Sequence, residues 1–428
     1  MHGSRNMLHD VSNRVVILLL VALSLSQVNI KCVNAKPRQE EQDDTVVTID
    51  DIQRLGEARL DDATRSYIAS GADREQTLKE NTAAFSRLRF RPRSLVDVSK
   101  IHTATTVLGR KISFPLGFSP SAAHMIAHED GEFGTARAAQ DAGTVMVVSA
   151  MSTASIEDIR ASAPGCLLWQ QMYIFRNRSL TESMIRRAEH QGIAAIVVTV
   201  DSPVYGQAIF INKNMFVLPR GLRFANLEAS WPGRSFTFDP SKEGSIGHLL
   251  SSSVTWEDFR WLRSITTLPL VAKGILTAES ALAAYENGAS AVVVSNHGGR
   301  LLDGNRATIE VLPEVVAAVG DRMEIYLDGG VRSGADAVKA VSFGARAVFV
   351  GRPALWGLAY NGKHGVDKVL EIFRSEFNHT IQLLGVPDAK NLGTDFVVRE
   401  PYYSQPLQPN GAPRHPWGDL FDYKIAVR

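Results

Sequence analysis

The sequence predicts an α/β protein built as a closed (β/α)8 TIM barrel, and three observations support this fold. Short apolar runs rich in β-branched residues recur along the chain, each is followed by a longer stretch with helical spacing, and runs such as Ile196-Val197-Val198 are hydrophobic at consecutive positions. Continuous hydrophobicity is typical of parallel strands that are covered on both faces. The predicted strands span residues 114–119, 144–149, 167–173, 194–200, 268–273, 291–296, 324–328 and 347–350.

The stretches that follow these runs are predicted to be the helices of the barrel, for example 334–343 and 366–384. An open doubly wound sheet is the alternative arrangement of alternating strands and helices. Such a sheet carries a glycine-rich phosphate fingerprint after its first strand, and Phe118-Ser119-Pro120 does not match it. The barrel is therefore the predicted fold.

Polar residues at the strand ends are the candidate functional residues, because (β/α)8 barrels place their active sites there. His297 and Arg300 follow the sixth run. An arginine can bind a carboxylate through two parallel bonds, and a histidine can act as a base near neutral pH. This pair predicts a substrate with a carboxylate and a nearby removable proton. The other candidates are Ser121, Ala122, Ser149, Gln171, Tyr173, Thr199, Asp201, Lys273, Asp328 to Arg332, Gly351 and Arg352.

From about residue 47 to about residue 395, the chain resembles the FMN-dependent L-2-hydroxy acid oxidase and dehydrogenase family. The order and the spacing of its motifs are those of the family. The motifs are Tyr67 to Ala72, Asn81 with Ala84-Phe85, Arg91-Pro92-Arg93, Gln171-Met172-Tyr173, Thr199-Val200-Asp201, Val271-Ala272-Lys273-Gly274, Ser295 to Arg300, Leu327 to Arg332 and Val350 to Pro353.

The resemblance implies a role for each residue that would meet the substrate. His297 is expected to be the general base, and Asp201 the carboxylate that orients it and stabilises its imidazolium form. Arg300 and Tyr67 are expected to bind the substrate carboxylate, and Tyr173 the substrate hydroxyl.

The resemblance also implies FMN as the cofactor, held at the mouth of the barrel. Lys273 is expected beside the flavin ring, where a fixed ammonium stabilises the negative charge of reduction. The flavin phosphate is expected over the ends of the last two strands, the usual phosphate position of this fold. The expected FMN ligands are Ser121, Ala122, Ser149, Gln171, Thr199, Lys273, Ser295, Asp328, Gly329, Gly330, Arg332, Gly351 and Arg352, and no metal site is predicted.

Several positions depart from the family pattern near the expected substrate. Leu301 stands where the family commonly has glutamine, Gly206-Gln207-Ala208-Ile209 lacks an arginine that many members carry, and Met151 replaces the tryptophan of glycolate oxidases. An unbranched methionine adapts more readily than tryptophan, so a substrate larger than glycolate is expected. The long segment 202–253 after the fourth strand is predicted to be a mobile lid, with a disordered insertion as the alternative.

The two ends of the chain differ in character from the barrel. Arg5 and Arg14 precede the apolar run Val15 to Leu25, and Val33-Asn34-Ala35 offers a signal-peptidase site. We therefore expect a cleaved secretory signal over 1–35, with an uncleaved membrane anchor as the alternative. A polar linker over 36–46, the FMN domain over 47–400 and a tail over 401–428 complete the predicted organisation.

Cleavage after Ala35 would remove Cys32 and leave Cys166 as the only cysteine, which excludes an intrachain disulfide. Asn177 and Asn378 begin glycosylation sequons that would be accessible in that compartment. The formal net charge of +1 gives no reason to expect a nucleic acid partner.

Three functions are consistent with the sequence. The first is an oxidase that oxidises a 2-hydroxy acid and returns the electrons to O2 as peroxide. The second is a membrane-associated dehydrogenase that passes electrons to a quinone or cytochrome. The third is a barrel that binds flavin without catalysis. A homo-oligomer is expected by analogy with relatives.

Overall fold

The computed structural model describes residues 45–204, 206, 216–239 and 241–399. The predicted signal segment 1–35, all but the last two residues of the predicted linker 36–46, and the predicted tail 401–428 lie outside the described residues. Among the described residues, no helix combines the length and the hydrophobicity that a bilayer crossing requires.

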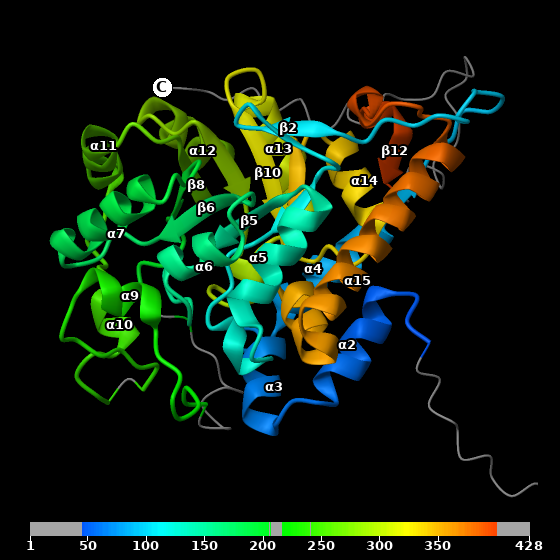
Figure 1. Cartoon of the computed structure of the whole chain (residues 1–428). Coiled ribbons are helices and arrows are strands. Elements are labelled where there is room, and N and C mark those ends of the chain that lie inside the picture. The colour runs from blue at the N-terminus through cyan, green and yellow to red at the C-terminus, as the bar shows by residue number, and fades with distance from the viewer. Residues whose placement is uncertain (1–44, 205, 207–215, 240, 400–428) are drawn as a thin grey trace, which may run out of the picture. The chain divides into compact units, whose positions relative to one another are not determined.

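The fold is a closed barrel of eight parallel strands, as the sequence predicts (Figure 1). Neighbouring strands are consecutive in the chain, and the last strand, β11, pairs with the first, β4. The barrel strands are β4 (Leu116–Phe118), β5 (Val145–Val148), β6 (Leu167–Met172), β7 (Ile196–Thr199), β8 (Leu270–Ile275), β9 (Ala291–Val294), β10 (Glu324–Asp328) and β11 (Ala347–Val350).

Each strand is followed by at least one helix on the outside of the barrel (Figure 1). These helices are α5 (Gly131–Ala142), α6 (Ile156–Ser162), α7 (Arg178–His190), α11 (Trp256–Ile265), α12 (Ala278–Glu286), α13 (Thr308–Val319), α14 (Gly334–Ser342) and α15 (Arg352–Leu384). The predicted helix 334–343 therefore corresponds closely to α14, and 366–384 is the second part of α15.

The elements outside the barrel come mainly from the two ends of the described chain. The predicted N-terminal helical segment consists of three helices, and the first of them packs along α15 (Figure 1). These elements are α2 (Ile49–Glu57), α3 (Asp62–Ala69), α4 (Gln76–Ser86), β1 (Leu88–Phe90), β2 (Thr105–Val107), β3 (Arg110–Ile112), β12 (Val397–Arg399), and the short 3-10 helices η1 (His124–Ile126), η2 (His297–Gly299), η3 (Ala389–Asn391) and η4 (Thr394–Phe396).

The interior of the barrel is filled with side chains at the amino ends of its strands. Trp169, Tyr326 and Phe349 form an aromatic group with ring centroids 5.5 to 5.7 Å apart. Val107 and Ile112 of the β2–β3 hairpin join this cluster. This part of the barrel is packed, and Phe349 also borders a pocket that lies toward the carboxyl ends.

In its described residues, the long segment after β7 contains two short helices, α9 (Ala225–Ser230) and α10 (Ile246–Leu249). Asn226 is 1% exposed, and its side-chain amide donates to the carbonyl of Ser149 and to Oε1 of Gln170. Phe224 and Leu227 are fully buried. In its described parts this segment is therefore packed against the barrel, which argues against a disordered insertion.

Candidate active site

A pocket opens at the carboxyl ends of the barrel strands, with an empty volume of about 1400 Å³ that includes its open mouth. It brings together residues from every strand end and from the N-terminal helices. The predicted residues that line it are Tyr67, Ser121, Ala122, Ser149, Gln171, Tyr173, Thr199, Lys273, His297, Arg300, Asp328, Gly329, Gly330, Arg332, Gly351 and Arg352. Asp201 and Ser295 are the two predicted site residues outside this lining.

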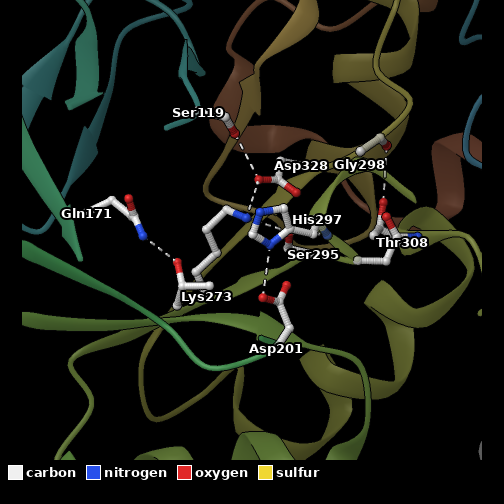
Figure 2. A network of polar contacts seen from close by, with 12 residues as sticks. Ser119, Gln171, Asp201, Lys273, Ser295, His297, Gly298, Thr308 and Asp328 are labelled. Carbon is white, nitrogen blue, oxygen red and sulfur yellow. Dashed lines mark hydrogen bonds and ion pairs between the residues drawn. The ribbon is translucent and has the colours of Figure 1, made fainter. Parts of the chain in front are cut away.

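Asp201 lies behind His297, and Nδ1 of the histidine is 3.0 Å from Oδ1 of the aspartate (Figure 2). Burial raises the pKa of Asp201, but the charge and the hydrogen bond of His297, together with the charge of Lys273, outweigh it and lower the pKa below its usual value. An ionised Asp201 accepts a hydrogen bond from Nδ1–H of His297, which leaves Nε2 to meet a ligand. Gly274 makes this approach possible, since a Cβ there would lie 2.5 Å from the Cβ of Asp201.

The loop that carries His297 has an unusual backbone. His297, Gly298 and Gly299 have φ angles of 57°, 63° and 74°, all in the left-handed region. That region is unfavourable for a residue with a Cβ, so surrounding contacts must hold His297 in it. The carboxamides of Asn81 and Asn296 donate to each other at 2.8 and 2.7 Å, and Oδ1 of Asn296 also accepts from the amide of Gly299. Helix α4 thereby fixes the loop.

Arg300 lies against Tyr67, with its guanidinium carbon 5.1 Å from the centre of the tyrosine ring. Its Nη1 donates to the carbonyls of Tyr67 and Ser70 at 2.8 and 3.0 Å. These bonds set the orientation of the guanidinium at the pocket. The arrangement suits a group that receives a carboxylate in a fixed position.

Lys273 and Asp328 form a buried pair, with side chains 5% and 7% exposed and Nζ 3.4 Å from Oδ2. Nζ also donates to Oγ of Ser295 at 3.0 Å, and Ser119 donates to Oδ2 of Asp328 at 2.8 Å (Figure 2). The other carboxylate oxygen, Oδ1, is buried and has no hydrogen-bond partner among the described residues. A buried acceptor without a partner is costly, which indicates that a ligand hydroxyl belongs there.

The amide of Gln171 organises the opposite side of the pocket. Its Oε1 accepts from the amide of Ala150 at 3.0 Å, and its Nε2 donates to Oγ1 of Thr199 at 2.9 Å. Ser149 lies 3.4 Å from the same Oε1. One side chain therefore fixes three strand ends, β5, β6 and β7, that border the pocket.

Two arginines border the pocket without a carboxylate partner among the described residues. Burial lowers the pKa of Arg332 to about 10, although three acidic side chains act in the opposite direction. Burial, with Arg300 and Arg332 nearby, also lowers the pKa of Arg352 well below its ordinary value. Two poorly compensated guanidiniums at one end of a pocket favour a bound anion.

Three glycines, Gly329, Gly330 and Gly351, line the pocket beside these arginines. Gly329 and Gly330 have φ angles of 94° and 83°, and a Cβ on Gly330 would lie 1.9 Å from the carbonyl oxygen of Asn81. A Cβ on Gly351 would lie 3.2 Å from Oγ of Ser121. Glycine is therefore required at position 330, where the N-terminal helices meet the end of β10.

Ser295, which the sequence predicts to be a cofactor ligand, lies next to the pocket and joins two other site residues. Ser295 is fully buried and lies outside the pocket lining. Its hydroxyl accepts from Nζ of Lys273 and from the backbone amide of His297. The residue therefore positions two predicted site residues.

Arg352 has a second role that the sequence did not indicate. Its Nε, Nη1 and Nη2 donate to the carbonyls of Ile68, Gly298 and Ser70 at 2.9, 3.0 and 3.0 Å. The side chain thus ties α3 and the His297 loop to the end of β11. Ser119 and Asn296 were also missed as site residues, although both stand inside stretches that the sequence analysis considered.

Comparisons with known proteins agree with the resemblance in the motifs. The sequence profile of the FMN-dependent dehydrogenase family matches residues 56–399. Human 2-hydroxyacid oxidase 1 is 42% identical over 360 residues, which cover 83% of this chain and 97% of that protein. The L-lactate oxidase of Nostoc sp. is 43% identical over 357 residues, which cover 82% of this chain and 98% of that protein.

Solved structures with the same fold include two that are described by their action on mandelate. A mandelate oxidase variant with (S)-mandelic acid superposes with a TM-score of 0.74 at 36% identity and covers 81% of this chain and 96% of its own. A soluble mutant of the membrane-associated (S)-mandelate dehydrogenase from Pseudomonas putida has a TM-score of 0.76 at 34% identity and covers 83% and 100%.

The residues present fit an FMN. Arg332, Arg352 and the glycine backbone at 329–330 suit its phosphate, and the unpaired Oδ1 of Asp328 suits a hydroxyl of its ribityl chain. Lys273 supplies a fixed cation for the ring. When bound, FMN accepts the two electrons that a substrate loses.

We predict that Arg332→Met weakens FMN binding without destabilising the flavin-free protein. Loss of a charge-assisted contact of about 1.5–3 kcal/mol should raise the Kd for FMN by one to two powers of ten. The Tm of the flavin-free protein should stay unchanged or rise, because a poorly compensated buried charge is removed. Flavin fluorescence titration and thermal melts measure the two effects.

Arg352→Met is the matched comparison, since it also removes three bonds to carbonyls and should lower the Tm. An unchanged Kd in Arg332→Met would place the phosphate elsewhere. A fall in Tm equal to that of Arg352→Met would show that Arg332 is mainly structural.

Proposed function

The chain belongs to the FMN-dependent dehydrogenase family, and on this premise we propose that it oxidises an L-2-hydroxy acid to the 2-oxo acid and passes the electrons to O2, which gives H2O2. The observation that carries the proposal is His297, which is held at 3.0 Å by Asp201 and lines one pocket with Arg300 and Lys273. A base and a carboxylate-binding cation beside a flavin site are the groups that this oxidation needs.

Each site residue has its own role in this reaction. Arg300, oriented by Tyr67 and Ser70, binds the substrate carboxylate, and Tyr173 contacts the substrate hydroxyl. His297 then takes a proton from the substrate at Nε2. Asp201, held ionised, stabilises the imidazolium that forms and keeps its ring in place.

Two other functions would use the same pocket. A dehydrogenase that passes its electrons to a quinone or cytochrome is favoured by the likeness to the membrane-associated (S)-mandelate dehydrogenase. A flavin-binding protein without catalysis is disfavoured, because the base, its carboxylate and the carboxylate-binding arginine all meet at one mouth.

We predict that the holoenzyme releases one H2O2 for each 2-oxo acid formed in air. The measurement pairs a peroxide assay with chemical quantification of the 2-oxo acid, and anaerobic bleaching of the flavin spectrum by the same substrate serves as control. Bleaching without peroxide, with rapid reoxidation by a soluble quinone, would favour the dehydrogenase. Absence of bleaching with every 2-hydroxy acid would leave the non-catalytic protein.

We predict that His297→Gln keeps its FMN but reduces it very slowly. Loss of a general base typically costs about 10²–10⁴-fold in rate, whereas the phosphate end of the site is untouched. Anaerobic stopped-flow at 450 nm, a wavelength at which flavins absorb, measures the effect. His364→Gln, at a side chain 83% exposed, is the matched control. A His297→Gln rate above a tenth of the wild-type rate would refute the assignment.

We predict that Arg300→Lys lowers kcat/KM by one to two powers of ten, which corresponds to about 1.5–3 kcal/mol for a lost charge-assisted bond. An ammonium cannot reproduce the planar fork that receives a carboxylate, nor its stacking on Tyr67. Arg306→Lys, in the same loop but in an exposed ion pair with Glu314, should leave kcat/KM unchanged. Wild-type kinetics in Arg300→Lys would mean that the carboxylate binds elsewhere.

A further inference from the structure

One side of the pocket is formed by apolar side chains from the loops after β5 and β9 and from segment 202–253, which follows β7. We call this side the apolar wall, and it consists of Met151, Val204, Phe238, Leu250 and Leu301. Met151 and Leu250 are 6% and 5% exposed, so little of either side chain is open to solvent.

The apolar wall lies next to the carboxylate-binding residues, and an aromatic side chain outside the wall packs against it. Phe238 packs against Tyr67 with ring centroids 5.2 Å apart, and Phe224 meets Phe238 edge-on at 4.8 Å. Phe216 stacks on Tyr67 at 4.3 Å. Because Tyr67 also contacts Arg300, a ligand held by its carboxylate at Arg300 starts next to aromatic and aliphatic surface.

Most cationic side chains in the described lining already have partners, so few of them can pair with a charged substituent of a ligand. Among the cations in the described lining, Lys273 is paired with Asp328, and Arg352 donates to three backbone carbonyls. Arg332 stacks on Trp356 at the phosphate end. Arg300 is therefore the cation available to a substrate there, and it suffices for one carboxylate.

A second carboxylate on the substrate would lose its water without gaining a cation from the described lining, and an amino group would not find an unpaired anion there. Asp328 already pairs with Lys273, and Asp201 lies behind His297 outside the lining. Burial of an uncompensated charge is strongly unfavourable. Apolar substituents, by contrast, gain free energy in proportion to the surface that they bury.

Apolar surface continues past the wall to the outside. Val204 is 63% exposed and Leu302, next to Leu301, is 68% exposed. Val217, next to Phe216, is 58% exposed. Val204 belongs to the pocket lining and Leu302 directly follows the lining residue Leu301, so apolar side chains are exposed at the mouth of the pocket.

We propose that the substrate is a monocarboxylic 2-hydroxy acid with an apolar side chain of several carbons, which lies along the apolar wall and extends toward the exposed valine and leucine. The proposal rests on the proposed function and specifies its substrate class. Glycolate, which has no side chain, and 2-hydroxy dicarboxylates are the acids that this pocket should use poorly.

The experiment measures flavin reduction in the holoenzyme under anaerobic conditions with a straight-chain series of (S)-2-hydroxy acids, from glycolate through lactate to 2-hydroxyoctanoate. We expect kcat/KM to rise about fourfold per methylene, the value for full burial of a CH2 group, until the chain leaves the wall. (S)-Malate should be at least 100-fold below 2-hydroxybutanoate, its counterpart without the second carboxylate.

Substitutions within the wall supply the second arm. Leu250→Asn should flatten the dependence on chain length, so that the loss grows with each added methylene. Leu301→Arg should raise the malate to 2-hydroxybutanoate ratio at least tenfold, because it supplies a cation beside Arg300. Leu383→Asn, at an exposed leucine of α15 outside the lining, is the matched control and should leave the series unchanged.

The result also separates this inference from the proposed function. If no acid of the series reduces the flavin, the proposed function fails. If the acids reduce it but kcat/KM is flat or falls from glycolate onward, or malate comes within tenfold of 2-hydroxybutanoate, the oxidase stands and the apolar substrate class is overturned.

Discussion

The left-handed backbone at residues 297–299 is the constraint on which the site depends. It lets two side chains only three positions apart, His297 and Arg300, meet the same pocket from one short loop. The left-handed conformation is unfavourable for His297, which has a Cβ, so contacts from other residues must stabilise it. The reciprocal amides of Asn81 and Asn296, and the bond from Arg352 to the carbonyl of Gly298, hold it from two directions.

The charged side chains around the pocket are unevenly distributed. Among the described residues, Asp201 is paired with His297 and Asp328 with Lys273, whereas Arg332 and Arg352 contact carbonyls and an aromatic ring and form no ion pair. Excess positive charge therefore gathers at the ends of β10 and β11, where a cofactor phosphate would neutralise it. The substrate end keeps a single free cation among its described lining, which is why its apolar wall can govern selectivity.

The sequence predicted the barrel and most of the pocket because both follow from local signals. Strands 324–328 and 347–350 have the predicted bounds, and the other strands differ by one or a few residues, because their ends depend on pairing with neighbours. Residues near the carboxyl ends of strands, such as Lys273 in β8, were found for the same reason.

What the sequence could not supply are contacts between distant segments. Asn81 acts on a loop 215 residues away, and nothing local marks it as part of the site beyond its place in a family motif. The bond between Ser295 and Lys273 also depends on how β8 and β9 pack against each other, which no local pattern indicates. The parts of segment 202–253 that pack on Tyr67 are likewise fixed by aromatic contacts with the N-terminal helices rather than by any regular pattern.

The tie between Arg352 and the carbonyl of Ile68 joins residues 284 positions apart. During synthesis the helix that carries Ile68 leaves the ribosome long before the last barrel strand. The two sides of the binding site that this bond joins, α3 and the end of β11, can therefore meet only late in synthesis. Contacts of such large sequence separation form late and slow the folding of the chain that contains them. The complete cofactor site can therefore form only after β11 and Arg352 have left the ribosome.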